Sequence, residues 1–239
     1  MRGLLAAFGY LLLKKEAMAF GYDIALDIAR ICTANDIKIR TVFDIGAHDG
    51  SVSTRFLKSF PAASVHAFEP HPTNHDLLGR ISNPRFSAHR FAVSDRSGSA
   101  AFYVYSEPSN NGPNSAPAAM NNTLLPHQHD RSIQVQCTTI DEFCAANAIG
   151  VVDLIKIDTE GHDAAVLRGA RRTLPTARFV ACEFSSLMER EGRDDSLCAI
   201  ARELEPIGFS FVATYPVHTT TNPYRTVADA LFFAESRAS

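Results

Sequence analysis

The sequence predicts a single α/β domain built on a mostly parallel β-sheet. After residue 40, short apolar runs of β type alternate with amphipathic helical segments, which is the rhythm of βαβ units. Near the end, two short apolar runs flank a stretch that contains Pro216 and Pro223, and this pattern indicates an antiparallel hairpin. The chain has 239 residues, a length at which one α/β domain is the usual arrangement.

The first half of the pattern contains four predicted strands and two predicted helices. Strands are predicted over residues 41–46, 64–69, 86–93 and 99–106, and helices over 51–60 and 73–80. In the first helix Val52, Phe56 and Phe60 recur at i, i+4 and i+8, so they share one face. Pro61 ends that helix because proline cannot continue it.

The second half contains the most apolar strand of the chain, residues 151–158, which is typical of a central strand covered on both faces. Further strands are predicted over 132–138, 178–184, 209–214 and 230–234, and helices over 140–148, 163–174 and 195–205. Residues 107–131 are rich in Pro, Asn, Ser and His and lack periodicity. Loops of that length are usually functional or disordered.

Residues 1–40 are predicted to form a helical extension that precedes the main domain, residues 41–239. The apolar run 4–13 is too short to span a bilayer and stops at Lys14 and Lys15. Its apolar surface is wider than one packed stripe, which predicts packing on the domain or contact with a second copy in a homodimer. The residues of that surface are Leu4, Leu5, Phe8, Leu11 and Leu12.

Charge and cysteine content exclude several classes of protein. Lys and Arg total 23 against 26 Asp and Glu, so the formal charge of -3 offers no field that would attract nucleic acid or anionic lipid. The five cysteines are odd in number and form no CxxC pair, as expected of reduced thiols. We therefore expect a cytoplasmic protein that has no membrane span and does not bind nucleic acid.

Candidate ligand-binding residues stand at the carboxyl ends of the first two strands, where open α/β sheets bind their ligands. The first strand runs into a loop with small residues, 44–50, whose glycines either let the backbone approach a ligand or serve only as turn formers. Glu69 ends the second strand, just before Pro70, and can accept hydrogen bonds from both hydroxyls of a ribose. Together these features predict an adenosine-type cofactor.

The first loop discriminates between two classes of cofactor. A dinucleotide site needs G-x-G-x-x-G, whereas this loop has the pattern Asp44-x-Gly46-x-x-x-Gly50. A carboxylate at Asp44 would repel a pyrophosphate but suits the ammonium group of a methionine moiety, so the loop favours S-adenosylmethionine. Two alternatives stay open: an NAD-dependent oxidoreductase, and a non-catalytic adenosyl-binding partner protein.

Five segments resemble the FkbM family of S-adenosylmethionine-dependent methyltransferases. They are residues 42–50, 67–74, 92–95, 139–143 and 155–161, and the most specific is Lys-Ile-Asp-x-Glu-Gly, which ends at Gly161 and precedes Val-Leu-x-Gly-Ala at 166–170. The resemblance implies a Rossmann-like class I methyltransferase fold, with seven strands and an antiparallel C-terminal strand. It also implies methyl transfer to a hydroxyl of a sugar, glycan or natural-product acceptor.

The resemblance assigns cofactor-binding roles residue by residue. The methionine end is implied for Asp44, Gly46, Ala47, His48 and Gly50, the ribose for Glu69 and Pro70, and the adenine for Val93, Ser94 and Asp95. The family often has Asn where this chain has His48. Simpler interpretations remain, since Asp95 could be a turn residue and His48 could only begin a helix.

Methyl transfer to a hydroxyl needs an aligned acceptor and a group that removes its proton. Asp158 and Glu160 follow the central strand and Glu183 ends its neighbour, so these carboxylates, together with His48, are the candidate acids and bases. Lys156 shares the face of Asp158, where it would pair with a carboxylate or contact the acceptor.

Other interpretations of these residues involve a metal, a helix cap and the acceptor loop. Asp158 and Glu183 could hold a divalent cation, but no ligand-spacing motif supports one, so a metal is possible and not predicted. Glu160 could instead cap the helix that follows it. The loop 107–131, with Asn121 and Asn122, is expected to close over the acceptor. Its His127 and His129 resemble a metal pair only superficially.

Overall fold

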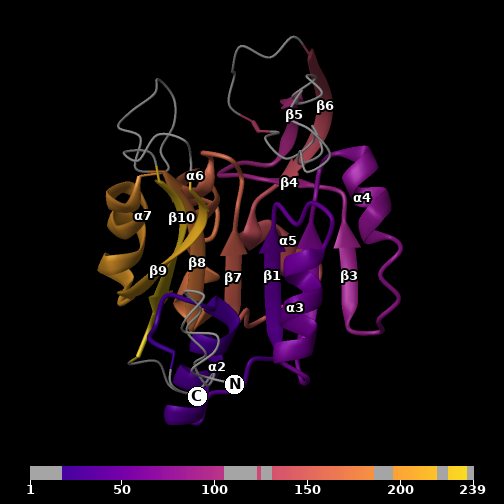
Figure 1. The fold of residues 1–239 in the computed structure, drawn as a ribbon. Coiled ribbons are helices and arrows are strands. Elements are labelled where there is room, and N and C mark those ends of the chain that lie inside the picture. The colour runs from indigo at the N-terminus through magenta and orange to yellow at the C-terminus, as the bar shows by residue number, and fades with distance from the viewer. Residues whose placement is uncertain (1–17, 105–122, 125–130, 186–195, 220–225, 236–239) are drawn as a thin grey trace, which may run out of the picture.

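The main β-sheet of the computed structural model has seven strands in the order β3-β2-β1-β7-β8-β10-β9 (Figure 1). The structure describes residues 18–104, 123–124, 131–185, 196–219 and 226–235. In chain order the strands are β1 Thr41–Ile45, β2 Ser64–Phe68, β3 Phe86–His89, β7 Leu154–Ile157, β8 Phe179–Ser185, β9 Ser210–Thr219 and β10 Thr226–Phe233.

The direction of the strands confirms the predicted fold class. Strands β3, β2, β1, β7 and β8 pair in parallel, whereas β10 is antiparallel to both β8 and β9. Strand β1 has β2 on one side and β7 on the other, so the order along the chain reverses at β1. Ile45 is in register with both Phe68 and Ile157, and the three strands therefore end level at this switch point.

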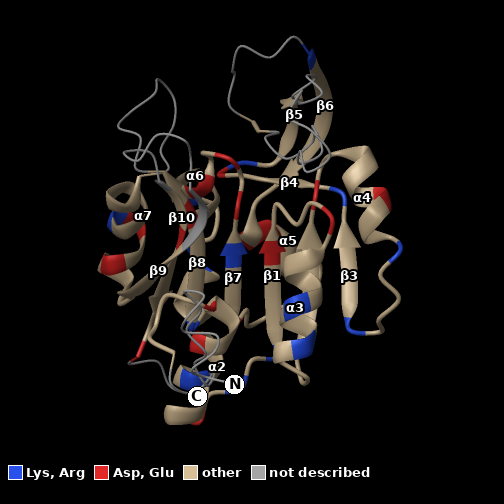
Figure 2. Cartoon of the chain, viewed as in Figure 1, with Lys and Arg blue, Asp and Glu red and all other residues tan. Residues whose placement is uncertain are grey.

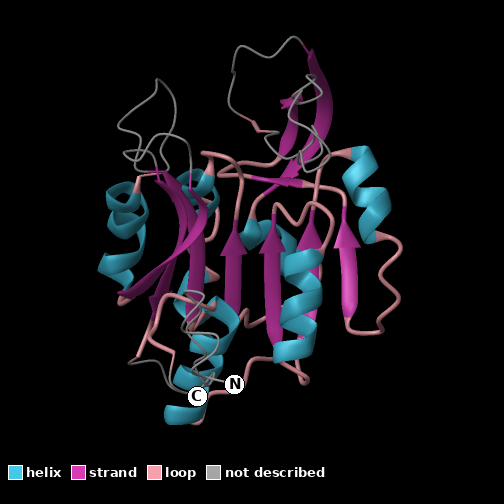
Figure 3. Cartoon of the chain, in the orientation of Figure 1, coloured by secondary structure: helices cyan, strands magenta, loops and turns pink. Residues whose placement is uncertain are grey.

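Helices cover both faces of the sheet (Figure 3). They are α2 Ile24–Ala34, α3 Ser51–Ser59, α4 Pro72–Leu78, α5 Ile140–Ala146, α6 Asp163–Arg168 and α7 Leu197–Leu204, with short 3-10 turns at Leu174–Thr176 and Glu205–Ile207. Alternation along β1 sends Val42 into the cluster with α2 and α3, and Phe43 into the cluster with α5, α6 and α7. Each face of the sheet thus has its own core.

A second sheet of three strands, β4-β6-β5, was not predicted. Its strands are β4 Ala92–Val93, β5 Gly98–Val104 and β6 Arg131–Thr138, and it lies above the carboxyl ends of the main strands in Figure 1. The single strand expected over 86–93 is therefore wrong. The chain leaves the main sheet after His89, and Ala92 and Val93 pair with Cys137 and Thr138 instead.

Helix α6 is shorter than the predicted span 163–174, because its C-cap Gly169 packs against the second sheet's connection. A Cβ at Gly169 would lie 2.1 Å from the carbonyl oxygen of Ser94. The helix ends at Arg168. The backbone contact between Gly169 and Ser94 fixes the segment after β4 next to the end of α6.

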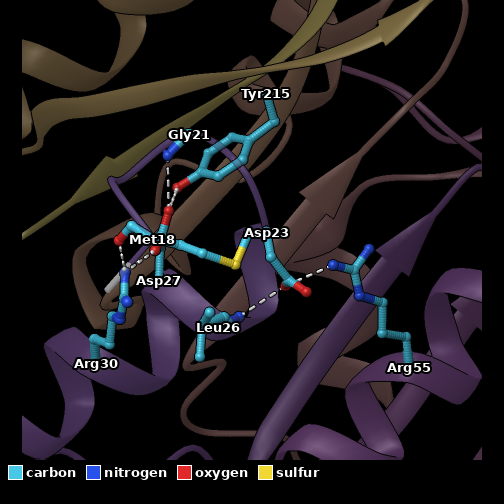
Figure 4. A network of polar contacts seen from close by, with 8 residues as sticks. All are labelled: Met18, Gly21, Asp23, Leu26, Asp27, Arg30, Arg55 and Tyr215. Atoms are coloured by element: carbon cyan, nitrogen blue, oxygen red, sulfur yellow. Dashed lines mark hydrogen bonds and ion pairs between the residues drawn. The ribbon is translucent and has the colours of Figure 1, made fainter. Parts of the chain in front are cut away.

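Helix α2 is anchored to the domain by a network of polar contacts (Figure 4). Asp27 is buried, and its Oδ2 atom accepts hydrogen bonds from the Gly21 N–H and the Tyr215 hydroxyl, both at 2.9 Å. Arg30 adds an ion pair to Asp27 at 3.2 Å. The division of the chain at residue 40 stays a prediction, and the apolar run 4–13, with its expected dimer contact, lies outside the described residues. No helix among those described is long and apolar enough to span a membrane.

Candidate functional site

A cavity of about 390 Å³ lies at the carboxyl ends of the main strands, next to the second sheet. The residues that line it come from the loop after β1, the end of β2, strand β4, the segment after β7, and strand β8. Those from the predicted site are Gly46, Ala47, His48, Glu69, Pro70, Val93, Asp158, Glu160 and Glu183. The switch point of the sheet therefore carries the cavity, as the general rule for open α/β sheets requires.

The glycines of the first loop are required by the backbone. Gly46 has a φ of +79°, and a Cβ there would lie 1.8 Å from the carbonyl oxygen of Asp158. Gly50 has a φ of +78°, and a Cβ there would meet side chains of Leu78 and Ile81 at under 3 Å. Only glycine avoids both conflicts. Gly46 lines the cavity, whereas Gly50 packs against Leu78 of α4 and does not line it.

Glu69 is fixed between the loops that follow β1 and β2. It is 5% exposed, its Oε2 atom accepts a hydrogen bond from the His48 N–H at 3.0 Å, and its Oε1 atom accepts one from the His71 N–H at 2.9 Å. Burial raises the pKa of Glu69 to about 7, although these N–H groups and the Asn74 side chain act in the opposite direction. A carboxylate can accept about four hydrogen bonds, so after these three it keeps capacity for a ligand hydroxyl.

Asp44 lies behind the first loop and is not among the residues that line the cavity. Its carboxylate is 2% exposed and accepts a hydrogen bond from the Ser53 hydroxyl at 2.5 Å. Burial raises the pKa of Asp44 to about 6, and the Ser53 hydrogen bond and the Lys156 charge oppose that shift. Asp44 can therefore act on a cavity ligand through its charge rather than by direct contact.

Of the three residues expected near the adenine, Val93 lines the cavity, whereas Ser94 and Asp95 follow it in the chain and do not line it. The Ser94 Oγ atom lies 3.1 Å from Asp95 Oδ1 and 2.9 Å from His162 Nε2. His162 lines the cavity, and sequence reasoning missed it. The one indication of His162 in the sequence was its position, directly after the Lys-Ile-Asp-x-Glu-Gly segment. Burial lowers the pKa of His162, so the ring is neutral at pH 7.

The three predicted acid–base carboxylates form one cluster. Asp158, Glu160 and Glu183 each place a carboxylate oxygen within 4.8 Å of the other two. Burial, followed by the charges of Asp158 and Glu160, raises the pKa of Glu183 to about 10. Glu183 therefore holds a proton at neutral pH, because closely spaced carboxylates cannot all ionise. The three oxygen ligands also suit a hard divalent cation.

Lys156 is buried beneath this cluster and pairs with two carboxylates (side chain 4% exposed). Its Nζ atom lies 2.9 Å from Asp229 Oδ1 and 3.3 Å from Asp158 Oδ2. Burial alone would lower the pKa of Lys156, but Asp158 and Asp229 raise it well above its ordinary value. Lys156 does not line the cavity, so the expected contact with an acceptor is absent from the described geometry.

Asp229 is the second residue that sequence reasoning missed. It lies on β10, in register with Glu183 on β8, which brings it to the buried ammonium of Lys156. Its signal in the sequence was a lone carboxylate inside the apolar run Val227-Ala-Asp-Ala-Leu231. A charge in such a run needs a partner, because an unpaired buried charge is costly.

The expected acceptor-side residues Asn121 and Asn122 lie outside the described residues, as do His127 and His129. Two neighbouring residues of the same segment are described. Leu124 lines the cavity, and Thr123 pairs with Tyr103 of β5 through two backbone hydrogen bonds of 2.8 and 3.1 Å. This part of the segment therefore reaches the cavity wall.

Comparison with known sequences identifies a family over most of the chain. The family model described as "Methyltransferase FkbM domain" matches residues 44–211. The "2-O-methyltransferase NoeI" of Sinorhizobium fredii is 29% identical over 164 residues, which cover 64% of this chain and 66% of that protein. The "Hexuronic acid methyltransferase AglP" of Haloferax volcanii is 27% identical over 160 residues, which cover 66% of this chain and 61% of that protein. The matches thus span just under two thirds of each relative's own length.

Among solved structures, similar chains include two methyltransferases of low sequence identity. The magnesium protoporphyrin IX methyltransferase ChlM of Synechocystis PCC 6803 is 11% identical, with a TM-score of 0.48 over 87% of this chain and 77% of that one. The METTL16 MTase domain is 10% identical, with a TM-score of 0.48 over 98% and 77% of the two chains.

Proposed function

This chain belongs to the FkbM family of methyltransferases, and we propose that it transfers a methyl group from S-adenosylmethionine to a hydroxyl oxygen of a sugar-containing acceptor. The observation that carries the proposal is the cavity at the switch point. It has Glu69 on one side and the carboxylate cluster Asp158, Glu160 and Glu183 on the other. A ligand that carries a ribose next to a positively charged group complements both.

We assign the cofactor contacts by this complementarity. Glu69 would accept hydrogen bonds from the ribose hydroxyls, with Pro70 packed beside it. The loop residues Gly46, Ala47 and His48 would line the methionine end, while Asp44 would favour the cationic half through its buried charge. These assignments rest on the position of each side chain in or behind the cavity.

The start of α3 favours this cofactor over a nicotinamide dinucleotide. A dinucleotide places its pyrophosphate on the free N–H groups at this helix N-terminus. Here the Asp49 carboxylate accepts a hydrogen bond from the Ser51 N–H at 3.0 Å, and Asp49 lines the cavity. A pyrophosphate would have to displace one negative charge and face another at Asp44. S-adenosylmethionine carries no phosphate and avoids both conflicts.

For the chemical step we propose Asp158 as the base. The Lys156 ammonium at 3.3 Å stabilises its ionised form, while Glu183 keeps its proton and can donate a hydrogen bond to the acceptor. S-adenosylmethionine, when bound, supplies a methyl group on a sulfonium sulfur, and that sulfur keeps the electron pair of the broken bond. Asp158 takes the hydroxyl proton as the new carbon–oxygen bond forms. His48 lines the same cavity and is the alternative base.

The acceptor class rests on the relatives. One is described as a 2-O-methyltransferase and the other as a hexuronic acid methyltransferase, and both descriptions support a sugar-containing acceptor. We propose that Asn121 and Asn122 contact this acceptor, since Leu124 of the same segment lines the cavity. The cysteines are free, which supports a reducing compartment such as the cytoplasm.

A methyl-transfer assay tests the proposal. The protein is incubated with S-adenosylmethionine labelled in the methyl group and with glycosides of neutral sugars and of hexuronic acids, and products are identified by mass spectrometry. We expect a methyl ether that survives mild alkali. A methyl group lost in alkali would be an ester on a hexuronic carboxylate and would contradict the hydroxyl assignment. Bound S-adenosylhomocysteine without transfer to any acceptor would favour the non-catalytic partner.

A further inference from the structure

His162 and its two partners form a chain of hydrogen bonds that fixes the protonation of the imidazole ring. A carboxylate oxygen only accepts hydrogen bonds, so Ser94 must donate its single hydroxyl proton to Asp95 Oδ1. The Ser94 oxygen then has only lone pairs left for His162 Nε2, 2.9 Å away, and Nε2 must carry a proton. Since the ring is neutral, the other nitrogen, Nδ1, carries none.

The position of Ser94 makes this arrangement rigid. Ser94 is 4% exposed, and its N–H donates a hydrogen bond to the Thr138 carbonyl oxygen at 3.0 Å. Its own carbonyl group packs against Gly169, where even a Cβ atom would lie 2.1 Å away. The Ser94 backbone is therefore held between β6 and the end of α6, which places its hydroxyl at the imidazole. The ring keeps one tautomer, with a bare acceptor at Nδ1.

His162, which carries this acceptor, is part of the cavity wall, whereas Asp95, which was expected to contact the adenine, is not. His162 lines the cavity next to Val93, but Asp95 is absent from the lining and its side chain is 38% exposed. Among the described residues, no group forms a hydrogen bond with His162 Nδ1. Asp95 is therefore linked to the cavity wall through Ser94 and the imidazole.

We propose that His162 recognises the adenine of the cofactor, with Nδ1 accepting a hydrogen bond from the exocyclic amino group, and that Ser94 and Asp95 are positioning residues that hold the required tautomer. The inference rests on the proposed S-adenosylmethionine site. It predicts a preference for a 6-amino purine, because a 6-oxo purine would turn an acceptor oxygen toward a second acceptor. A buried pair of acceptors that lack a shared proton is unfavourable.

Calorimetric titration with S-adenosylhomocysteine and with S-inosylhomocysteine tests this inference, since the two ligands differ only at the purine. We expect the wild-type protein to bind the adenosyl compound about tenfold or more tightly than the inosyl compound. In His162→Phe the ring shape stays and the acceptor is lost, so the ratio should fall to about one. His162→Asn restores an acceptor oxygen and should recover part of the ratio. His75→Phe, outside the cavity, is the matched control and should keep the wild-type ratio.

Ser94→Ala is the second variant, and it tests the tautomer itself. Without the Ser94 oxygen, Nε2 no longer needs its proton, and the ring can move that proton to Nδ1 and donate to the oxygen of the inosyl compound. The ratio should therefore fall, chiefly because the inosyl compound binds more tightly. This variant decides the question if His162→Phe does not fold, which thermal melting would reveal.

The outcomes separate this inference from the proposed function. If the wild-type protein binds S-adenosylhomocysteine and the ratio stays unchanged in His162→Phe, or in Ser94→Ala, the adenine assignment is overturned while the cofactor site stands. If the wild-type protein binds neither compound, the cofactor proposal itself is overturned and the inference with it.

Discussion

Two groups of carboxylates, at opposite ends of the sheet, have different surroundings. At the amino end, Asp27 receives hydrogen bonds from Gly21 and Tyr215 and an ion pair from Arg30 (Figure 4). In the same network Asp23 caps α2 through the Leu26 N–H at 2.9 Å and pairs with Arg55. Each negative charge there meets donors or cations of the protein itself.

At the carboxyl end, acidic segments gather above β1 and β7 (Figure 2). The three carboxylates of the cluster have Lys156 as their close cation in the described structure, and Asp229 shares it. Burial and mutual repulsion raise the pKa of Glu183 and burial that of Glu69. The comparison indicates that carboxylates paired within the α2 network hold the fold together, while those gathered around the cavity, with raised pKa values at Glu69 and Glu183, are placed to receive a ligand or a proton.

The largest expected effect comes from breaking the α2 network. Asp27→Ala leaves the Arg30 cation and the Tyr215 hydroxyl without their buried partner, which should lower the free energy of unfolding by about 3–5 kcal/mol. Urea unfolding measures the loss, and Asp76→Ala on the exposed side of α4 is the control. The affinity of the folded fraction for S-adenosylhomocysteine should not change. A variant as stable as the control would contradict the structural role of Asp27.

Removing a carboxylate from the other group should have the reverse profile. Glu69→Ala should weaken binding of S-adenosylhomocysteine about 100-fold, because two hydrogen bonds to a charged acceptor are lost. Stability of the ligand-free protein should fall by less than in Asp27→Ala, since burial of Glu69 is itself costly. Calorimetry and thermal melting separate the two quantities. Unchanged affinity would rule out Glu69 as the ribose acceptor.

The contrast also predicts a dependence on pH. The folded-state pKa of Glu69, about 7, exceeds its ordinary value of 4.5, so the folded protein holds a proton that the unfolded chain has released. That contribution to stability is full below about pH 4.5 and is lost as the pH rises through 7, by up to about 1.4 kcal/mol per pH unit. Glu69→Gln removes it.

Unfolding of the wild-type and Glu69→Gln proteins at pH 5, 6, 7 and 8 checks this sign. The Gln variant should gain stability relative to the wild type as the pH rises. The buried histidines titrate with the opposite sign, and taking the difference between the two proteins cancels them. A difference that is constant with pH would show that Glu69 is ionised across this range.

Chelation should have the smallest effect. The carboxylate cluster has ligands suited to a divalent cation, but the Lys156 ammonium already supplies positive charge beside Asp158. We expect methyl transfer to be unchanged after treatment with a chelator. Activity that disappears and returns on addition of magnesium would assign the cluster to a metal.

The sequence predicted the parts of this molecule that depend on local pattern. Short apolar runs predicted a strand at the place of each strand of the main sheet, although residues 86–93 were wrongly assigned to one strand. The position of Glu69 at the end of the second strand predicted its place at the cavity. It did not reveal the second sheet, because β4 has two residues and its pairing with β6 is a matter of tertiary register. A short apolar run carries no sign of which sheet it joins.

The missed site residues have a similar cause. His162 meets Ser94 across 68 residues of chain, and Asp229 reaches Lys156 only because β10 lies against β8. Asp44 is the opposite case, a predicted cavity residue that does not line the cavity. Its side chain points toward Ser53 on α3 instead. Such relations depend on packing, which periodicity and spacing do not specify.

The central claim is that Glu69 and the carboxylate cluster at the switch point form a site for S-adenosylmethionine. Calorimetric titration of the wild-type protein with S-adenosylhomocysteine, and separately with NAD, tests it most directly. We predict binding of S-adenosylhomocysteine at one site per chain, binding about 100-fold weaker in Glu69→Ala but unchanged in Asp27→Ala, and no binding of NAD. Binding of NAD without S-adenosylhomocysteine would contradict the claim.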